Sequence, residues 1–143
     1  MIFLDSNVLV SYFISSAPRH ADAAAFLDSA LAAGESIAVS PQIVMESFRA
    51  MTHEKIFRDR VNAAQFHEVM SDFLSDPALV LVGPGRAAVD CALNAAVDLN
   101  ISSARIFDLL LYGTMREHGV TRLATLNPRH FTGLDGIELL AVG

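Results

Sequence analysis

The sequence predicts a single α/β domain over residues 1–143, with a central, mostly parallel sheet of four to five strands and helices on both faces. Short apolar runs alternate with longer segments in which apolar residues recur every three or four positions. Strands that alternate with helices favour a parallel sheet. The apolar runs are continuous rather than alternating with polar residues, which fits strands covered on both faces. The chain contains no repeat, linker or low-complexity segment.

Five short runs rich in Val, Ile and Leu are the candidate strands. In chain order they are Ile2–Leu4, Ser36–Val39, Leu79–Val82, Arg122–Leu126 and Ile137–Ala141. The segments between them have helical spacing, which is clearest in two stripes of apolar residues. These stripes are Phe66, Val69, Met70, Phe73 and Leu74, and Ala88, Ala92, Ala95, Ala96 and Leu99.

Residues that start, end or interrupt helices support these boundaries. Ser40 followed by Pro41 is an N-cap residue with a first-turn proline. Gly34 and Gly119 fall where helices should end in a left-handed residue. The Gly83–Gly85 segment, which contains a proline, separates the third strand from the helix that follows it.

Composition excludes several classes of protein. A hydrophobic content of 52% and a mean hydropathy of +0.41 exclude a disordered chain. No apolar run approaches the ~18 residues of a membrane-spanning helix, and the first apolar segment has no basic leader and is interrupted by Asp5. Cys91 is the only cysteine, so neither an internal disulfide nor a cysteine metal site can form. A soluble, cytoplasmic protein is therefore expected.

The chain is acidic, with 10 Lys and Arg against 16 Asp and Glu and a formal charge of −6. This balance argues against a strong general affinity for nucleic acid. Four basic residues nevertheless fall within twelve positions, namely Arg49, Lys55, Arg58 and Arg60. They form either a solvated helix face with acids interspersed or a phosphate contact.

A carboxylate interrupts the first apolar segment, which reads MIFLDSNVLV. An unpaired carboxylate in a dry core would carry an idealised cost of order 20 kcal/mol, so Asp5 should lie at the edge of the core. Asp5 ends the first strand, and function in open parallel sheets collects in the crevice outside the carboxyl ends of the strands. Asp5 could instead simply cap the helix that follows.

Three further polar residues stand at the edge of apolar surroundings. Glu46 lies early in the helix after the second strand, and Asp108 lies near the start of the penultimate helix. Asn127 ends the fourth strand. Taken singly, Glu46 and Asp108 could be first-turn helix acids and Asn127 a turn initiator. Strand ends and the helix starts after them share one rim of a parallel sheet, so all four segments should converge there.

Converging carboxylates need a cation. Two of them at ~4 Å repel by about 4 kcal/mol at an effective dielectric near 20. Ligand sets made only of oxygen select Mg²⁺ or Mn²⁺ rather than zinc. A hard divalent ion beside a cleft typically activates water against a phosphate ester.

The ordered set of motifs resembles PIN-domain proteins and is most similar to the VapC toxins of bacterial toxin–antitoxin pairs. The motifs are Asp5-Ser6-Asn7-Val8-Leu9, then Glu46, Asp108 and Leu123-Ala124-Thr125-Leu126-Asn127-Pro128-Arg129-His130-Phe131. The match runs essentially end to end. The resemblance implies an endoribonuclease dependent on Mg²⁺ or Mn²⁺, with its acidic cluster carried by Asp5, Glu46 and Asp108. Asn7 and Thr125 match supporting polar positions around that cluster.

The sequence departs from the family at two positions. Many PIN domains have an acid where this chain has Asn127, and relatives often have Asp in place of His130. Asparagine still offers an oxygen but adds no charge, so the site carries one negative charge fewer. Weaker metal binding is expected, more so for a second ion than for a first.

The resemblance also implies a mechanism. Asp5 and Asp108 would hold the ion, and Glu46 would bind it or orient its water for attack on an RNA phosphodiester. Asn127 would orient a metal-bound water or the substrate. Arg105 is either a phosphate contact or an ordinary surface arginine.

Partners are implied as well. VapC-like proteins commonly form homodimers and bind a small antitoxin that carries a DNA-binding region. Val44, Phe48 and Met51 form a stripe that could pack against the core or against another subunit. An acidic cleft attracts a basic peptide, so an inserted arginine could pair with Asp5 or Asp108 and displace the metal.

Two other functions compete with cleavage. One is a PIN domain that binds RNA or protein without cutting, which Asn127, His130 and the acidic surface favour. The other is a phosphatase or receiver domain. Haloacid-dehalogenase-like phosphatases need a second Asp where this chain has Asn7, and receiver domains need an Asp after the third strand, where this chain has Gly83.

Overall fold

The computed structural model describes residues 1–143 and has a five-stranded sheet in which every pair of neighbours is parallel. The strand order is β3-β2-β1-β4-β5. The strands are β1 (Ile2–Leu4), β2 (Ile37–Val39), β3 (Leu79–Leu81), β4 (Arg122–Ala124) and β5 (Glu138–Leu140). The predicted α/β fold with a parallel sheet is confirmed.

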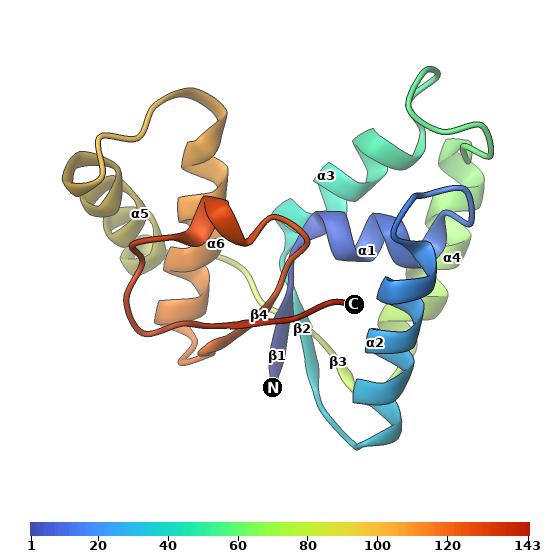
Figure 1. The fold of residues 1–143 in the computed structure, drawn as a ribbon, viewed down its shortest axis with the longest axis horizontal. Helices are drawn as coiled ribbons and strands as arrows, with labels where there is room; N and C mark the ends of the chain where they lie inside the picture. Colours follow the sequence, from blue (N-terminus) through green and yellow to red (C-terminus); the bar gives the residue numbers. More distant parts are fainter.

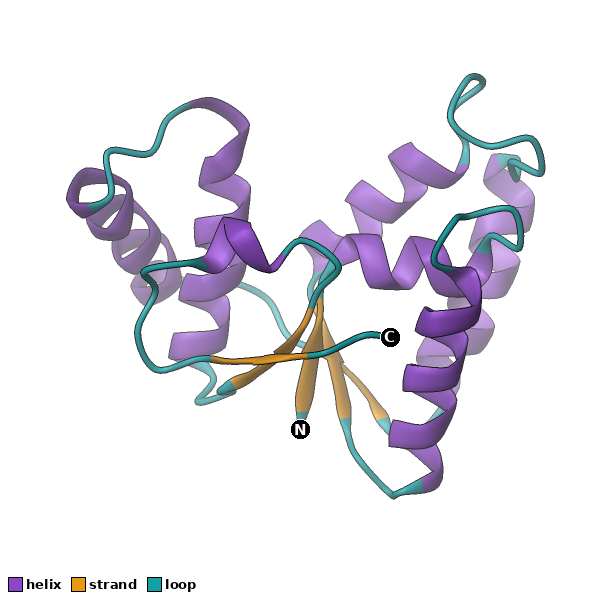
Figure 2. Ribbon diagram, in the orientation of Figure 1, coloured by secondary structure: helices purple, strands orange, loops and turns teal.

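Six α-helices cover the sheet on both sides. They are α1 (Ser6–Phe13), α2 (His20–Ala32), α3 (Pro41–Met51), α4 (Ala63–Ser75), α5 (Arg86–Asp98) and α6 (Ile106–Glu117). Figures 1 and 2 show α5 and α6 on one side of the sheet and α1 to α4 on the other. Two short 3-10 helices, η1 (Ser103–Arg105) and η2 (Pro128–Phe131), precede α6 and follow β4. None of the helices is long and apolar enough to span a lipid bilayer.

The start and stop signals in the sequence act as predicted. The Ser40 hydroxyl accepts a 3.2 Å hydrogen bond from the Ile43 N–H and so caps α3, with Pro41 as the first helical residue. Gly34 and Gly119 adopt φ values of 77° and 67° after α2 and α6, a region that suits glycine.

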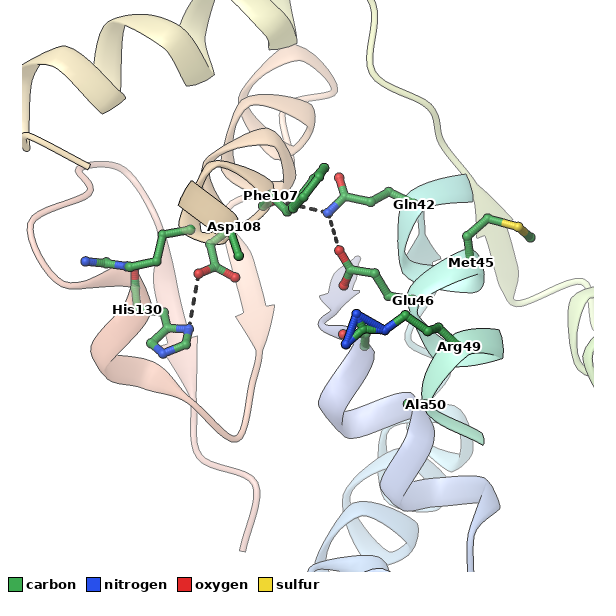
Figure 3. A pocket seen from close by; sticks show the side chains of 11 residues that line it. Gln42, Met45, Glu46, Arg49, Ala50, Phe107, Asp108 and His130 are labelled. Atoms are coloured by element: carbon green, nitrogen blue, oxygen red, sulfur yellow. Dashed lines mark hydrogen bonds and ion pairs between the residues drawn. The ribbon is translucent and has the colours of Figure 1, made fainter. Parts of the chain in front are cut away.

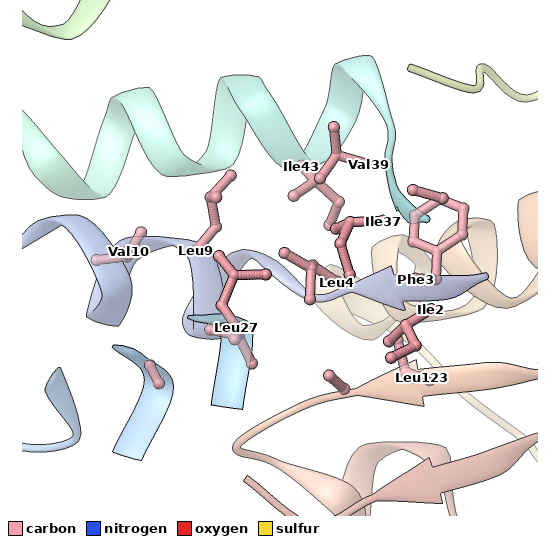
Figure 4. Packing of buried hydrophobic residues seen from close by; sticks show 14 of the residues in the cluster. Ile2, Phe3, Leu4, Leu9, Val10, Leu27, Ile37, Val39, Ile43 and Leu123 are labelled. Atoms are coloured by element: carbon pink, nitrogen blue, oxygen red, sulfur yellow. The ribbon is translucent and has the colours of Figure 1, made fainter. Parts of the chain in front are cut away.

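The core lies on the inner strands and the helices against them. Ile2, Phe3 and Leu4 of β1 are buried and pack with neighbours from β2, β4 and the helices (Figure 4). The edge strands β3 and β5 are partly exposed. The α5 and α6 helices approach closely at Gly113, where an added Cβ would overlap the Ala88 carbonyl oxygen. The packing of α6 matters for function because this helix carries Asp108.

The basic residues that were predicted on one helix face lie mostly in a loop. The α3 helix ends at Met51, so Lys55, Arg58 and Arg60 lie in the loop before α4 rather than on a helix face, although they are exposed as expected.

The stripe formed by Val44, Phe48 and Met51 lies only partly in the core. Val44 and Met51 are buried, whereas Phe48 is 37% exposed and its ring packs edge-to-face on Phe66 of α4 with the ring centroids 5.1 Å apart. Core packing therefore accounts for two members of the stripe and leaves only the Phe48 ring for a contact with another subunit.

Candidate active site

The strand order places two polar residues at the point where the direction of the sheet reverses. From β1 the chain builds outward through β2 and β3, and it then returns to the other side of β1 with β4 and β5. The carboxyl ends of β1 and β4 therefore flank the switch point, where parallel sheets bind their ligands. Asp5 follows β1 and Thr125 follows β4.

Asp5 is held by side chains from both segments. It is only 7% exposed, and its Oδ2 accepts hydrogen bonds from Asn7 Nδ2 at 2.8 Å and from Thr125 Oγ1 at 2.7 Å. Asp5 occupies the N-cap position of α1, but its side chain makes no capping hydrogen bond. Helix capping therefore does not account for this carboxylate.

Asn7 and Thr125 also fix the backbone that leaves β4. The Asn7 Oδ1 accepts a 3.0 Å hydrogen bond from the Leu126 N–H, and Thr125 Oγ1 accepts one of 3.0 Å from the Asn127 N–H. The apolar run predicted a strand that continues to Leu126, but β4 ends at Ala124. These hydrogen bonds explain the earlier end. The last residues of that run turn toward Asn7 and contribute to the site.

Two carboxyl groups of the predicted cluster have raised pKa values. Burial is the main cause at Asp5, where the hydrogen bond from Thr125 opposes it and the negative charge of Glu46 adds to it. Burial also raises the pKa of Asp108, opposed by His130 and Arg105 and reinforced by the charges of Asp5 and Glu46. The three acids thus lie close enough to act on one another, although they come from three separate segments.

Glu46 and Asp108 face each other across a cleft of about 630 Å³ (Figure 3). We call it the acid cleft. It is lined by Ser6, Gln42, Met45, Glu46, Arg49, Ala50, Ala104, Arg105, Phe107, Asp108 and His130. Asp5 does not itself line the cleft, but its neighbour Ser6 does, and the Ser6 hydroxyl lies 3.4 Å from Asp5 Oδ1.

Each facing carboxylate contacts a polar side chain that the sequence did not predict as its partner. Gln42 Nε2 donates to Glu46 Oε1 at 2.7 Å and to the Phe107 carbonyl oxygen at 3.2 Å, which links α3 to α6 (Figure 3). His130 Nδ1 lies 3.1 Å from Asp108 Oδ2, and the His130 side chain is 46% exposed. The spacing of Gln42 and Glu46, four residues apart on one helix, was a usable signal. No feature of the sequence indicated the contact between η2 and α6.

Glu46 and Asp108 lie at different positions within their helices. Glu46 is the sixth residue of α3 and lies outside its first turn, so the interpretation of Glu46 as a first-turn acid is wrong. Asp108 does lie in the first turn of α6, where the helix dipole also favours a negative charge.

Asn127 lines a neighbouring space instead of the acid cleft. This second pocket has a volume of about 720 Å³ and shares Arg105 and His130 with the cleft. We call it the basic pocket. It is lined by Arg105, Leu126, Asn127, Pro128, Arg129 and His130.

The carboxylates suit a hard divalent cation in donor type and charge. Carboxylate oxygens gathered in this way are ligands whose negative charge Mg²⁺ or Mn²⁺ would neutralise. Their present rotamers do not form a closed ligand set, because no group of three or more His, Cys, Asp or Glu side chains is arranged to hold an ion. Glu46 and Asp108 are turned toward Gln42 and His130. Binding would therefore require these two side chains to rotate toward Asp5.

Comparison with known proteins finds relatives along the whole chain. The family model of the PIN domain matches residues 2–136. Ribonuclease VapC13 of Mycobacterium tuberculosis is 30% identical over 143 residues, which cover 99% of this chain and 100% of the relative. Ribonuclease VapC24 of the same species is 28% identical over 132 residues, covering 92% and 90% of the two chains.

Solved structures share the fold. VapBC2 from Rickettsia felis, bound to a DNA fragment from its promoter, superposes with a TM-score of 0.69 at 18% identity over 98% of each chain. FitAcB from Neisseria gonorrhoeae gives a TM-score of 0.68 at 18% identity over 99% of this chain and 97% of that one. VapC20 of M. tuberculosis, a toxin that cleaves the sarcin–ricin loop, gives 0.65 at 12% identity over 86% and 87%.

Proposed function

The chain belongs to the PIN domain family, and from this premise we propose that it is a metal-dependent endoribonuclease and the toxin of a toxin–antitoxin pair. The observation that carries this proposal is the placement of Asp5, Glu46 and Asp108 around the switch point of the sheet. Burial raises the pKa of Asp5 and of Asp108, and the charge of Glu46 adds to both shifts. The names of the relatives, which are ribonucleases, supply the reaction class.

In this proposal Asp5, Glu46 and Asp108 hold the cation. Bound there, Mg²⁺ or Mn²⁺ would polarise the phosphodiester and supply an acidified water as nucleophile. Thr125 and Asn7 donate to Oδ2 of Asp5, which leaves Oδ1 with only the Ser6 hydroxyl at 3.4 Å. Oδ1 is therefore the Asp5 oxygen available as a ligand, and the two donors fix its direction.

Other residues of the acid cleft suit an RNA strand. Arg49 and Arg105 line the cleft and supply positive charge for phosphates. The Phe107 side chain is 51% exposed beside the cleft, and an exposed aromatic ring is a surface on which a nucleobase can stack. Of the two roles expected for Asn127, orientation of the substrate fits its place in the basic pocket.

A small antitoxin and a homodimer complete the proposal. The solved relatives include toxin–antitoxin complexes, and a basic antitoxin segment would find Glu46 and Asp108 on the walls of the acid cleft. An arginine inserted there would compete with the cation. For a dimer, α5 offers a larger exposed apolar face than α3. It is formed by Val89, Leu93 and Val97. Light scattering on Leu93→Asp tests that surface, since a dimer built on it should dissociate.

Cleavage of a generic RNA tests the enzymatic part. The purified protein should cut in Mn²⁺ and stop cutting when the ion is chelated. Asp108→Asn should abolish cleavage, whereas Asp72→Asn, the same change at an exposed site on α4, should leave it intact. RNA binding without any cleavage would favour the alternative of a non-cleaving PIN-fold module, in which Glu46 and Asp108 would keep their present contacts with Gln42 and His130.

A further inference from the structure

The basic pocket differs in charge from the acid cleft beside it. Its side chains include Arg105, Arg129 and His130, and none is a carboxylate. The acid cleft, in contrast, contains Glu46 and Asp108. In a chain with a formal charge of −6, a pocket with two guanidinium groups and no acid is a local reversal of the overall charge.

The two guanidinium groups are available to a ligand. Arg129 makes no ion pair and no side-chain hydrogen bond, whereas Arg86 and Arg122 are paired with carboxylates. Arg105 uses Nη2 to donate to the His130 carbonyl oxygen at 2.9 Å, which leaves its other N–H groups unused. Planar guanidinium groups with free donors recognise phosphate oxygens well.

The walls of the basic pocket are tied to the carboxylate cluster. The His130 N–H bonds the Asn127 carbonyl oxygen at 3.0 Å, and the Asn127 N–H bonds Thr125 Oγ1 at 3.0 Å. Thr125 in turn donates to Asp5. This chain of hydrogen bonds holds the basic pocket at a constant position relative to Asp5.

The two spaces adjoin each other at Arg105 and His130, which line both. A strand whose scissile phosphate lies in the acid cleft can therefore place a neighbouring phosphate in the basic pocket. We propose that the pocket formed by Arg105, Asn127, Arg129 and His130 is a phosphate subsite that holds an RNA phosphate next to the one that is cleaved. This inference rests on the proposed ribonuclease function. Its physical purpose is to offset the repulsion between an acidic protein and a polyanion.

Binding of RNA in the absence of cleavage tests the subsite. Fluorescence anisotropy of a labelled single-stranded oligonucleotide, measured in EDTA over a series of salt concentrations, gives the slope of log K against log salt. For a single strand that slope changes by roughly 0.7 for each phosphate contact. Arg129→Gln should reduce the slope by about that amount and weaken binding at every salt concentration.

Matched variants separate the subsite from general charge. Arg86→Gln makes the same change at an arginine of α5 whose side chain is 90% exposed and lines neither space, and its slope should equal that of the wild type. Arg129→Lys keeps the charge and should keep most of the slope. Equal slopes for Arg129→Gln and wild type, equal losses for Arg129→Gln and Arg86→Gln, or a wild type that shows no salt-dependent binding would each overturn the proposal.

Cleavage kinetics separate this proposal from the proposed function. If both hold, Arg129→Gln in Mn²⁺ should raise KM with little change in kcat, because the contact forms with bound substrate as well as in the transition state. If Arg129→Gln loses the expected slope relative to the wild type but the wild type never cuts RNA, the nuclease function is contradicted and the phosphate subsite remains supported. If the wild type cuts RNA and Arg129→Gln has the same kinetics and the same slope as the wild type, only the proposal of a phosphate subsite is contradicted.

Discussion

The Thr125 hydroxyl donates a 2.7 Å hydrogen bond to Asp5 Oδ2, although 120 residues separate the two in the chain. The bond joins the ends of β1 and β4, which are neighbours in the sheet. It also directs a buried carboxylate that no helix cap or ion pair would otherwise hold. The arrangement of the candidate site depends on this contact more than on any single motif.

Thr125→Val should therefore destabilise the protein. The change removes a donor from Asp5 and the acceptor of the Asn127 N–H, and groups left unsatisfied in this way cost about 1–3 kcal/mol. Thr125→Ser keeps both hydrogen bonds and loses only a methyl group, worth about 0.8 kcal/mol. Urea unfolding of the three proteins measures the difference. Equal stability of the Val and Ser variants would show that the hydroxyl makes no net contribution.

Asp5→Asn should leave the metal-free protein as stable as the wild type at pH 7, or more stable. Burial raises the pKa of Asp5, so the folded chain favours the protonated carboxyl, and its contribution to the free energy of unfolding is lost as the pH rises through that raised pKa. Asparagine can place its oxygen where Oδ2 accepts from Asn7 and Thr125.

Urea unfolding in EDTA, at pH 7 and at a pH well below the usual aspartate pKa of about 3.9, tests this expectation. The advantage of the Asn variant should shrink in acid, where the wild-type carboxyl is protonated in both the folded and the unfolded state. A variant that is clearly less stable at pH 7 would contradict it.

Phe107→Ala should weaken RNA binding with little effect on folding. Base stacking on an aromatic side chain is worth about 1–3 kcal/mol, and the half-exposed ring contributes little to the core. Ile56→Ala is the control, because Ile56 has a similar exposure of 48% in the loop before α4 and does not line the acid cleft. Anisotropy in EDTA gives both affinities. Equal losses in the two variants would exclude a base contact at Phe107.

Asn127→Asp distinguishes a role in the basic pocket from one at the cation. A carboxylate beside Arg105 and Arg129 should weaken RNA binding, because it neutralises the charge that phosphate would contact. The affinity for Mn²⁺ should stay unchanged, since the new carboxylate would pair with the two guanidinium groups of the basic pocket. Asn94→Asp on α5 adds the same charge at an exposed position. Calorimetry that shows tighter Mn²⁺ binding in Asn127→Asp alone would place residue 127 at the ion.

Local sequence signals predicted most of the fold. The apolar runs located all five strands, and Ser40-Pro41, Gly34 and Gly119 act as expected at the helix ends. The family was identified correctly from motifs spread over the whole chain. Errors arose where tertiary contacts decide the outcome. The fourth strand is shorter than its apolar run because the Leu126 N–H bonds Asn7, and two of the three residues of the α3 stripe, Val44 and Met51, are buried in the core.

Only the parts of the candidate site that follow from strand topology could be predicted. Asp5, Glu46 and Asp108 were singled out because strand ends and helix starts share one rim, and the structure brings their charges together. The partners Gln42 and His130 depend on rotamers and on how separate segments approach each other. The division between an acid cleft and a basic pocket has the same origin, since Arg105 and Arg129 become neighbours only through the fold.

Calorimetric titration with Mn²⁺ tests most directly whether three distant carboxylates form one metal site. Wild-type protein should bind the ion, and Asp5→Asn, Glu46→Gln and Asp108→Asn should each lose roughly tenfold or more in affinity, at least as much as the loss of an outer-shell partner. Asp72→Asn, at an exposed position on α4, should bind like the wild type. A wild type that does not bind Mn²⁺, or equal affinity in the three acid variants and the Asp72 control, would contradict a shared metal site at the end of β1.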